Sequence, residues 1–412
     1  MPDLASTQLA RGMRDLLPEE MARVRRVESA FSQTCRAWGY GEIRTPVIEP
    51  LHLFTAAGTL SPQTLDRVYS FLDWDGWSGE RVVLRPDSTI AAARLYAERL
   101  DGGRIAKLFY SQPVLRFTDD GSSREEWQCG VELIGDTGRA GDVELVSLAL
   151  EALGALALPD VQVRLSHAGI VRGVLAAAGL APEEQSAAYD RLLDGDLAVA
   201  DEVEARLPQL AAPLRLLFEI EGEGSGYIAN LHAALAGAVP GLRAPLDELA
   251  FVVESLEARG IAPRIAPVLA RRFEYYSGIV MGFQSAGRRI GAGGRYDELI
   301  GLVGGTRVPA SGFALFVPPL IELIATDPER AAPALTVEAA SATPRAAAAA
   351  YEAARALRAA GIDVETIAPS AVPAGGRLLC SDASPCYVLE RGGAAATFQC
   401  IADVVAALER AR

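Results

Sequence analysis

The residues best suited to bind a small polar molecule lie between positions 271 and 297. The stretch reads RRFEYYSGIVMGFQSAGRRIGAGGRYD and places Arg271, Tyr275 and Tyr276 ahead of two short apolar runs. We predict two antiparallel strands joined by a turn, the second ending at Gly291, Gly293 and Gly294, which let a ligand approach the backbone. A plain hairpin with a tight turn and surface charges is equally compatible with these residue types.

The composition limits the class of protein. The chain has 412 residues, of which 50% are hydrophobic and 22% charged, and this indicates a soluble globular protein with two or more domains. Its net charge of -14 argues against broad electrostatic attraction to nucleic acid. The five cysteines show no CxxC spacing and the three histidines no metal-binding pattern, so we expect neither disulfides nor a metal site. With no secretory signal and no segment long enough to span a bilayer, a cytoplasmic protein is expected.

Sequence periodicity predicts the elements that position the candidate residues. Pro18 and the acids after it start a helix whose apolar residues recur at helical spacing up to Gly39. The segment 42–50, EIRTPVIEP, contains prolines that an interior strand would not tolerate, so it is predicted as an edge or interface strand. The following predicted elements are a hairpin of 66–73 with 81–85, a helix from Ser88 to about 100, strands at 107–117 and 126–134, a helix at 142–158 and a strand at 161–165.

The second half of the chain predicts a helical segment and a separate small domain. Residues from about 170 to 259 are rich in alanine and leucine, which favours a helical insertion between strands of the sheet. Residues 325–344 are rich in alanine and proline without a clear period, and we predict a linker there. The expected domains are therefore 1–324 and a small α/β domain at 345–412.

Five separated segments match one family in that family's order. They are RGMRDLLPEE with RTPVIEP, LRPDSTIAAAR, the strand pair around Arg116 and Gln128, RRFEYYSG, and GAGGRYDELIG, over roughly residues 10–320. In these segments the chain resembles histidyl-tRNA synthetase. The resemblance implies an α+β fold of the class II synthetase type, with an antiparallel sheet flanked by helices. It also implies a dimer formed through the first long helix and the strand ending near Pro46.

Carried over residue by residue, the resemblance implies a histidine-binding site. Asp87 stands where the family has a glutamate that holds the amino group, and Gln128 matches a glutamine that contacts the substrate. Arg271 matches an arginine near the carboxylate, although by type alone it could be an ordinary surface arginine. Tyr275 and Tyr276 match the aromatic pair beside the imidazole, whose ring nitrogen a tyrosine can hydrogen-bond. The predicted ligand-binding residues are Asp87, Arg116, Gln128, Arg271, Tyr275 and Tyr276.

Structural alternatives exist for several of these residues. Asp87 could only cap the helix that follows it. Gln128 lies on a predicted strand and could face either way. Arg116 could hold a loop or another subunit, and Arg295 and Asp297 could pair within a turn without touching a ligand.

The nucleotide side of the family pattern departs in this chain. Where the family has arginine, any residue, glutamate, this sequence has Arg116, Phe117 and Thr118, and of the later arginines in that loop only Arg124 has a clear match. In the last motif a proline, Pro319, replaces the arginine that grips the triphosphate, and we expect the pair 318–319 to disfavour the first turn of the helix there. Loss of that cation predicts that adenylation is impaired.

A synthetase-like chain with its amino-acid site kept and its ATP grip lost resembles the regulatory subunit of ATP phosphoribosyltransferase. That resemblance implies a non-catalytic, cofactor-free protein that forms a hetero-oligomer with the short catalytic subunit, is needed for its activity and confers inhibition by histidine. Histidine could bind in the inherited pocket or at a subunit interface. The short tail and the acidic charge argue against reading tRNA.

Two other functions are compatible with the sequence. A divergent active histidyl-tRNA synthetase would catalyse histidine-dependent exchange of pyrophosphate with ATP. A paralogue acting on some other partner would bind histidine without either activity.

Overall fold

The computed structural model describes most of the chain and divides it into two compact units, Met1–Ile324 and Ala325–Arg412. The described residues are 9–56, 68–74, 79–100, 105–117, 123–135, 138–193, 196, 198–219, 221–266, 276–304, 306–325, 335–366, 376–383 and 386–410.

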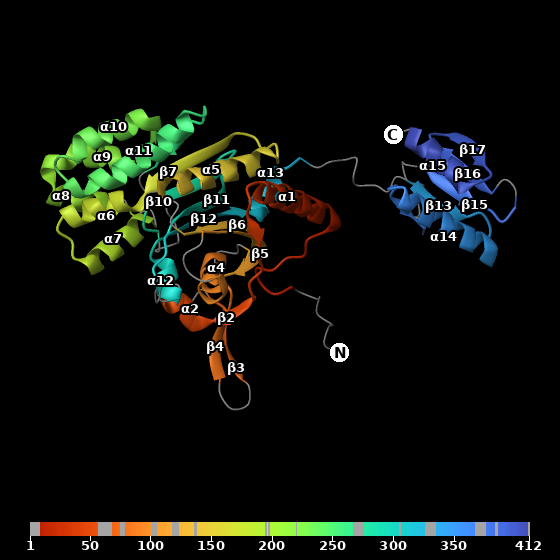
Figure 1. The fold of residues 1–412 in the computed structure, drawn as a ribbon, viewed down its shortest axis with the longest axis horizontal. Helices are drawn as coiled ribbons and strands as arrows, with labels where there is room; N and C mark the ends of the chain where they lie inside the picture. Colours follow the sequence, from red (N-terminus) through yellow and green to blue (C-terminus); the bar gives the residue numbers. More distant parts are fainter. Residues whose placement is uncertain are drawn as a thin grey trace, which may run out of the picture. The chain divides into compact units, whose positions relative to one another are not determined.

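The first unit is built on a nine-stranded sheet flanked by helices, which confirms the predicted fold class (Figure 1). Its central strands pair antiparallel, whereas β1 with β5 and β7 with β9 are parallel. In spatial order the strands are β1 Gly41–Glu42, β5 Ala106–Leu115, β6 Glu125–Ile134, β12 Ala310–Phe316, β11 Arg288–Arg295, β10 Ile279–Ser285, β7 Val161–His167, β9 Arg264–Ile265 and β8 Gly222–Glu223.

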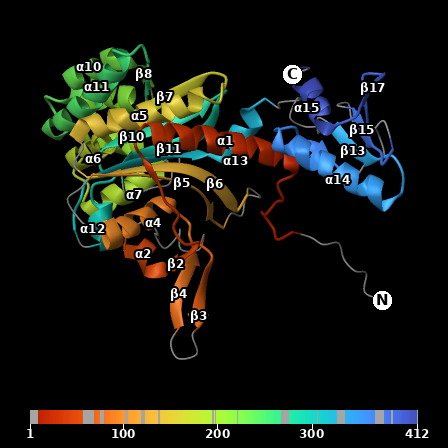
Figure 2. The same ribbon diagram turned by 45° about the vertical axis from the view of Figure 1, so that its right-hand side comes forward.

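Three helices, α1, α5 and α13, cover one face of this sheet (Figure 1, Figure 2). The helix α1 starts at Pro18, as predicted, and buries Val27, Phe31 and Cys35. On the other side of the sheet lie α2, α4 and α12, and the last turn of α4 continues as a π-helical turn, η1. The bounds are α1 Pro18–Ala37, α5 Gly138–Gly154, α13 Val317–Leu323, α2 Leu51–Ala56, α4 Ser88–Leu95, η1 Tyr96–Leu100 and α12 Leu299–Gly304.

One expectation about α13 was wrong. Pro318 and Pro319 do not prevent the first helical turn but form it, directly after Val317. Backbone N–H groups in a first turn have no partner within the helix, so prolines cost nothing there and their fixed φ suits the helix start.

The predicted helical segment consists of six helices among the described residues, gathered at one end of the sheet (Figure 1). His167 joins it to β7, because its Nδ1 accepts from the backbone N–H of Gly169 at 3.0 Å and its Nε2 lies 3.1 Å from Glu248 Oε2 on α11. An accepting Nδ1 requires the proton on Nε2, which donates to that carboxylate. The helices are α6 Ala168–Ala177, α7 Pro182–Leu193, α8 Ala198–Arg206, α9 Ala211–Glu219, α10 Gly224–Leu235 and α11 Arg243–Glu257, with the short 3₁₀ turns η2 Pro208–Leu210 and η3 Pro240–Leu242.

The predicted strand at 42–50 is interrupted. It forms β1 and then β2, Ile48–Pro50, which pairs with the hairpin of β4, Gly79–Leu84, and β3, Ser70–Trp74. A buried arginine, Arg85, explains the gap, since its guanidinium donates to the backbone oxygens of Thr45 and Pro46 in place of a neighbouring strand. The β3–β4 hairpin projects away from the rest of the unit (Figure 1, Figure 2).

The glycine-rich hairpin forms as predicted, but its second strand ends later than predicted. Its turn is at Ala286 and Gly287, both with positive φ, of 48° and 74°. The second strand does not stop at the glycines but runs through them as β11, paired with β10 on one side and β12 on the other. Backbone hydrogen bonding on both sides outweighs the low strand propensity of glycine.

The second unit is a five-stranded sheet with two helices and its own core. Its strand β13 lies within the segment 325–344 predicted as a linker, so that prediction was wrong for residues 335–339. The strand was missed because its parallel partners, β14 and β15, lie far along the sequence. The elements in sheet order are β14 Val364–Glu365, β13 Leu335–Ala339, β15 Arg377–Cys380, β16 Tyr387–Arg391 and β17 Ala394–Phe398, with α14 Pro344–Ala359 and α15 Ile401–Arg410.

None of the described helices is both long enough and apolar enough to span a bilayer.

Candidate functional site

The candidate site is organised by alternate residues of β6. Side chains at Glu126, Gln128 and Glu132 share one face of the sheet because strand residues two apart point the same way. On the neighbouring strand β5, Tyr110 lies opposite Gly130 in the register. The start of α4 lies on the same face as these groups. The negative charge of Asp87, the N-cap of α4, is close enough to raise the pKa of both Tyr110 and Glu132.

Glu132 is the centre of a buried polar group that we call the Glu132 cluster: Asp87, Tyr110, Glu132, Tyr276 and Tyr296. The Glu132 side chain is 1% exposed, and its Oε1 accepts from the Tyr110 hydroxyl at 3.0 Å. Its Oε2 accepts from the Tyr296 hydroxyl. Burial raises the pKa of Glu132 to about 8, although hydrogen bonds from Tyr296, Thr89 and Tyr110 lower it and the charge of Asp87 raises it further. A carboxyl group with this pKa is mostly protonated at neutral pH and ionises as the pH rises through about 8.

Three glycines make room for the Glu132 cluster. A Cβ on Gly130 would lie 2.3 Å from the Tyr110 ring, and one on Gly294 would lie 2.7 Å from the Tyr276 ring. A Cβ on Gly312 would lie 2.1 Å from Glu132 Oε2. Because these positions on β6, β11 and β12 are glycines, the tyrosine rings and the carboxyl group can lie directly against the sheet.

Asp87 has the helix-capping role that the sequence left open. It is the N-cap of α4, and its Oδ1 accepts from the backbone N–H of Ile90 at 2.9 Å. It is only 6% exposed, and its negative charge acts on Glu132 and Tyr276. Burial raises the pKa of Tyr276, with the nearby positive charge of Arg289 opposing the shift. Capping therefore does not remove Asp87 from the cluster.

Arg116 and Gln128 meet at a third side chain, Glu126. The amide Nε2 of Gln128 donates to Glu126 Oε1 at 2.5 Å, and Arg116 Nη1 lies 3.9 Å from the same oxygen. Arg116 Nε donates to the carbonyl oxygen of Pro86 at 2.7 Å, which links the guanidinium to the residue before Asp87. These contacts place both predicted ligand-binding side chains on the side of the sheet where α4 begins.

The structure thus places four of the six predicted site residues on one region of the fold. Asp87 and Tyr276 belong to the Glu132 cluster, whereas Arg116 and Gln128 gather around Glu126. Arg271 and Tyr275 lie outside the described residues.

Three residues of the cluster are absent from the predicted ligand-binding set: Tyr110, Glu132 and Tyr296, of which only Tyr296 lies in the stretch 271–297 that the sequence indicated. A signal for Glu132 was present, since it is the one acid in the apolar part of the strand that follows Gln128, and burial of an acid is costly without a specific partner. Nothing local indicated Tyr110 or the contact of Tyr296 with Glu132, because the two tyrosines reach Glu132 from β5 and from the end of β11.

Arg295 is a structural residue rather than part of this cluster. Its Nη2 donates to Asp142 Oδ2 at 2.9 Å and to the carbonyl of Gly138, which ties β11 to the start of α5. It also pairs with Asp297 at 3.4 Å, as the sequence suggested. Asp142 accepts from the Ser311 hydroxyl at 3.1 Å, so the buried ion pair has further hydrogen bonds.

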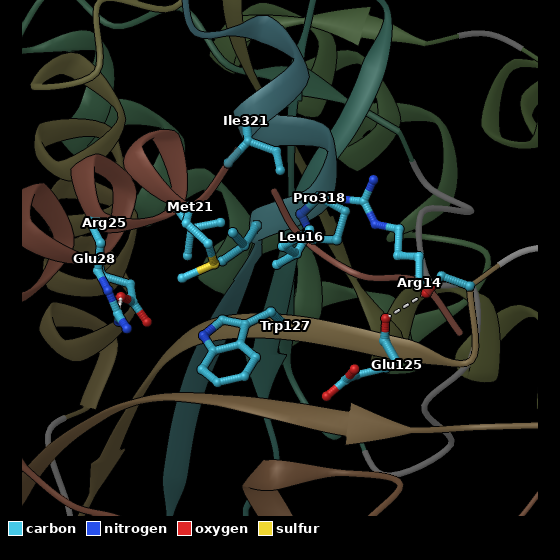
Figure 3. Close-up of a pocket in the computed structure, with 12 residues that line it drawn as sticks. Arg14, Leu16, Met21, Arg25, Glu28, Glu125, Trp127, Pro318 and Ile321 are labelled. Atoms are coloured by element: carbon cyan, nitrogen blue, oxygen red, sulfur yellow. Dashed lines mark hydrogen bonds and ion pairs between the residues drawn. The ribbon is translucent and has the colours of Figure 1, made fainter. Parts of the chain in front are cut away.

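A separate cavity of about 100 Å³ lies on the opposite face of β6, between α1 and α13 (Figure 3). Trp127 contributes to its wall, as expected for a residue one position from Glu126 and Gln128. The remaining lining residues are Arg14, Leu16, Met21, Val24, Arg25, Glu28, Ser123, Glu125, Val317, Pro318 and Ile321. This cavity is therefore distinct from the Glu132 cluster.

The comparisons with known proteins agree with the fold and with the segments that carry the site. The family model described as histidyl-tRNA synthetase matches residues 12–320. A curated protein of Dehalococcoides mccartyi, named ATP phosphoribosyltransferase regulatory subunit, is 48% identical over 316 residues, which are 76% of this chain and 76% of that protein. A protein of the same name from Symbiobacterium thermophilum is 36% identical over 325 residues, covering 76% of this chain and 79% of its own length.

Solved structures show the same architecture. A Bacillus halodurans protein described as an ATP phosphoribosyltransferase regulatory subunit/histidyl-tRNA synthetase superimposes with a TM-score of 0.74 at 25% identity, over 92% of this chain and 94% of that one. Histidyl-tRNA synthetase from Nostoc has the same TM-score, 0.74, at 19% identity over 98% and 99% of the two chains, which supports the fold alone. The chain therefore belongs to the histidyl-tRNA synthetase family and, within it, to the ATP phosphoribosyltransferase regulatory subunits.

Proposed function

We propose that this chain is a cytoplasmic, non-catalytic regulatory subunit that the short catalytic subunit of ATP phosphoribosyltransferase requires for the first step of histidine biosynthesis. We further propose that it mediates feedback inhibition by histidine. The observation that carries the proposal is the Glu132 cluster, a buried acid-and-tyrosine group in a chain whose curated relatives are named regulatory subunits.

The chemistry of the cluster suits histidine. A buried carboxyl at Glu132 can accept the N–H of an imidazole, and the aromatic rings of Tyr110 and Tyr276 offer faces for packing. The carboxylate of Asp87 is suited to an ammonium group. If histidine binds one conformation of the assembly more tightly than the other, it shifts the activity of the partner by linkage.

The nucleotide side supports a non-catalytic role. Adenylation needs cations aimed at the phosphates, and at the start of α13 this chain has Pro319 where the synthetase family has an arginine. The guanidinium carbon of Arg124 lies 3.9 Å from the centroid of the Phe117 ring, and its Nη1 donates to the Tyr69 hydroxyl at 3.1 Å. Arg116 is beside Glu126. Arg116 and Arg124 thus both interact with other side chains of the same chain.

The resemblance implied a dimer formed through the first long helix and the strand ending near Pro46. We propose a different interface, which we call the hairpin surface and which carries five exposed apolar side chains on and beside β2 and β3. Leu72 and Trp74 are 55% and 64% exposed, and all residues of β3 are exposed. Large exposed apolar groups close together mark interaction sites in soluble proteins. The hairpin surface comprises Val47, Ile48, Phe71, Leu72 and Trp74, with Leu72 and Trp74 on one face of β3 and Phe71 on the other.

The proposal is tested by reconstitution with the short catalytic subunit. We expect the wild-type chain to be required for phosphoribosyl transfer to ATP, and added histidine to inhibit the reconstituted enzyme. In calorimetric titrations, Glu132→Gln and Asp87→Asn should each weaken histidine binding by about tenfold or more, since each removes a charge or an acceptor from a buried contact. Asparagine can still cap α4, so this variant separates ligand binding from capping.

A charge-matched control is Glu98→Gln, on the exposed turn after α4. It should leave histidine affinity unchanged within about twofold, as exposed ion pairs contribute little. Failure to bind or activate the catalytic subunit would remove the regulatory function. Histidine-dependent pyrophosphate exchange with ATP would instead identify an active synthetase.

A further inference from the structure

In the candidate site, the side chains best placed to bind an anion are those of Arg116 and Gln128. Both of them contact the carboxylate of Glu126. Its Oε1 lies within hydrogen-bonding distance of Gln128 Nε2, at 2.5 Å, and 3.9 Å from Arg116 Nη1. An N–H of the amide and a guanidinium are the donors that would otherwise bind a ligand carboxylate or phosphate. The carboxylate of Glu126 therefore stands where such an anion would go.

Glu126 is also partly exposed to water. Its side chain is 34% exposed, whereas Gln128, with which it shares a strand face, is 4% exposed as a residue. Turning the carboxylate outward would return it to water, so its displacement does not bury an unpaired charge. Arg116 would remain positioned by its hydrogen bond to the Pro86 carbonyl.

We propose that Glu126 is a specificity-determining residue that competes with the ligand's carboxylate for Arg116 and Gln128. The inference rests on the proposed histidine site and adds to it the group that sets its affinity. A ligand carboxylate must displace Glu126, so histidine binds more weakly than the donors alone would allow. Ligands with more negative charge, such as polyphosphates, are excluded by the repulsion between their charge and that of Glu126.

Competition by Glu126 should affect only ligands that carry a negative charge. Histidine carries a carboxylate, whereas histamine has the same imidazole and amine without it. Removing the charge of Glu126 should therefore favour histidine and should not favour histamine. A residue that merely maintained the local structure would affect both ligands alike.

The test is calorimetric titration of the full chain and its Glu126→Gln variant with histidine, histamine and inorganic pyrophosphate. Glutamine keeps the size of the side chain and an acceptor for Gln128. We expect the Kd of histidine to fall by about tenfold, which is modest because the ion pair is partly exposed. The Kd of histamine should stay within about twofold or rise, and pyrophosphate should bind the variant more tightly than the wild type.

The matched control is Glu125→Gln, which makes the same change one residue earlier, on the other face of β6 and in the wall of the separate cavity. It should alter none of the three affinities. Glu126→Ala provides a second variant and should shift the ratio of histidine to histamine affinity in the same direction as Glu126→Gln.

The outcomes distinguish this proposal from the proposed function. If histidine binds wild type and Glu126→Gln equally, competition by Glu126 is disproved while the histidine site stands. If no form binds histidine, the histidine site fails and the pyrophosphate titration decides the role of Glu126. A gain of pyrophosphate affinity confined to the Glu126 variants then supports competition, and no gain overturns it.

Discussion

At the scale of single residues, the candidate site depends on the hydrogen bonds and the burial of Glu132. Hydroxyls of Tyr110 and Tyr296 satisfy its two oxygens, yet the residue is buried deeply enough that burial dominates its titration. The result is a carboxyl group that is mostly protonated at neutral pH, so a ligand that favours the ionised form would change its charge. Such groups are common at functional sites because binding a ligand alters the balance.

This titration predicts a pH dependence of stability. The folded pKa of Glu132 is about 8, above its usual 4.5, so the folded chain binds the proton more tightly than the unfolded chain does. The contribution of this group is fully present below pH of about 4.5 and is lost as the pH rises towards about 8. We expect Glu132→Gln to remove that decline. Urea unfolding of both proteins between pH 6 and 8.5 measures it.

Comparing the slopes controls for other titrating groups, since these are the same in both proteins. If the difference between the unfolding free energies of wild type and Glu132→Gln does not change over that interval, Glu132 is ionised throughout and its burial does not control its charge.

The sequence indicates the types of the important side chains better than it indicates their partners. Asp87 was recognised both as a candidate ligand and as a helix cap, and the capping contact is present in the structure. The pairing of Arg295 with Asp297 was also anticipated. The dominant partner of Arg295, Asp142, was not, because it approaches from the start of α5, far along the chain.

At the scale of elements, the side chains of the candidate site pack directly against the backbone of the central sheet. Gly130, Gly294 and Gly312 lie on three neighbouring strands, and each leaves the space that a site side chain occupies. The glycines are thus required by the packing of side chains across strands rather than by turns. This explains why the glycine cluster lies within β11 and not at its end.

Gly312→Ala is predicted to destabilise the first unit by about 2 kcal/mol, within the range for overpacked cores. The added Cβ would lie 2.1 Å from Glu132 Oε2 and 2.4 Å from the backbone oxygen of Val131, and the backbone cannot move aside cheaply. The control is Gly154→Ala at the end of α5, where nothing lies within 4 Å. That change should be neutral or stabilise by up to about 1 kcal/mol, because alanine favours a helix.

Denaturant midpoints of the two variants measure the contrast. An equal response to the two substitutions would show that the strands can separate enough to accept a methyl group at position 312. The strands around Gly312 would then be less rigid than the short distances from its Cβ position to Glu132 and Val131 indicate.

Helices were predicted more reliably than the shortest strands. The starts of α1 and α4 follow from local signals, Pro18 with its acids and Asp87 as a cap. The strand β13 and the break after β1 were missed. Both depend on partners distant in sequence: β13 on its parallel neighbours, and the break on the guanidinium of Arg85.

At the scale of the whole molecule, two separate hydrophobic cores support two compact units. The Glu132 cluster, Glu126 and the hairpin surface all belong to the first unit. We therefore expect ligand binding and self-association to be properties of that unit.

The proposed dimer predicts that Leu72→Asp weakens self-association by about tenfold or more. Leu72 is 55% exposed on β3, so the aspartate does not disturb a core but would become buried in the interface. Leu302→Asp is the control, since Leu302 is 49% exposed on α12, outside the hairpin surface. Sedimentation equilibrium should show a wild-type dimer that only Leu72→Asp disrupts.

Equal association of the two variants would exclude the hairpin surface as the dimer interface. A wild-type chain that is monomeric at all concentrations would exclude self-association itself. The apolar side chains of β2 and β3 would then be available to the catalytic partner.

The sequence by itself determined the family and the order of the main elements, together with the types of side chain available for an amino-acid ligand. These depend on local signals: periodicity, caps, turn residues and short motifs. Only the tertiary structure decided that Glu132 is the centre of a buried polar cluster, that Glu126 contacts Arg116 and Gln128, and that glycines on separate strands make room for the tyrosines. Burial, and the charge state that follows from it, are set by residues distant in the chain, and the sequence does not show which of them meet.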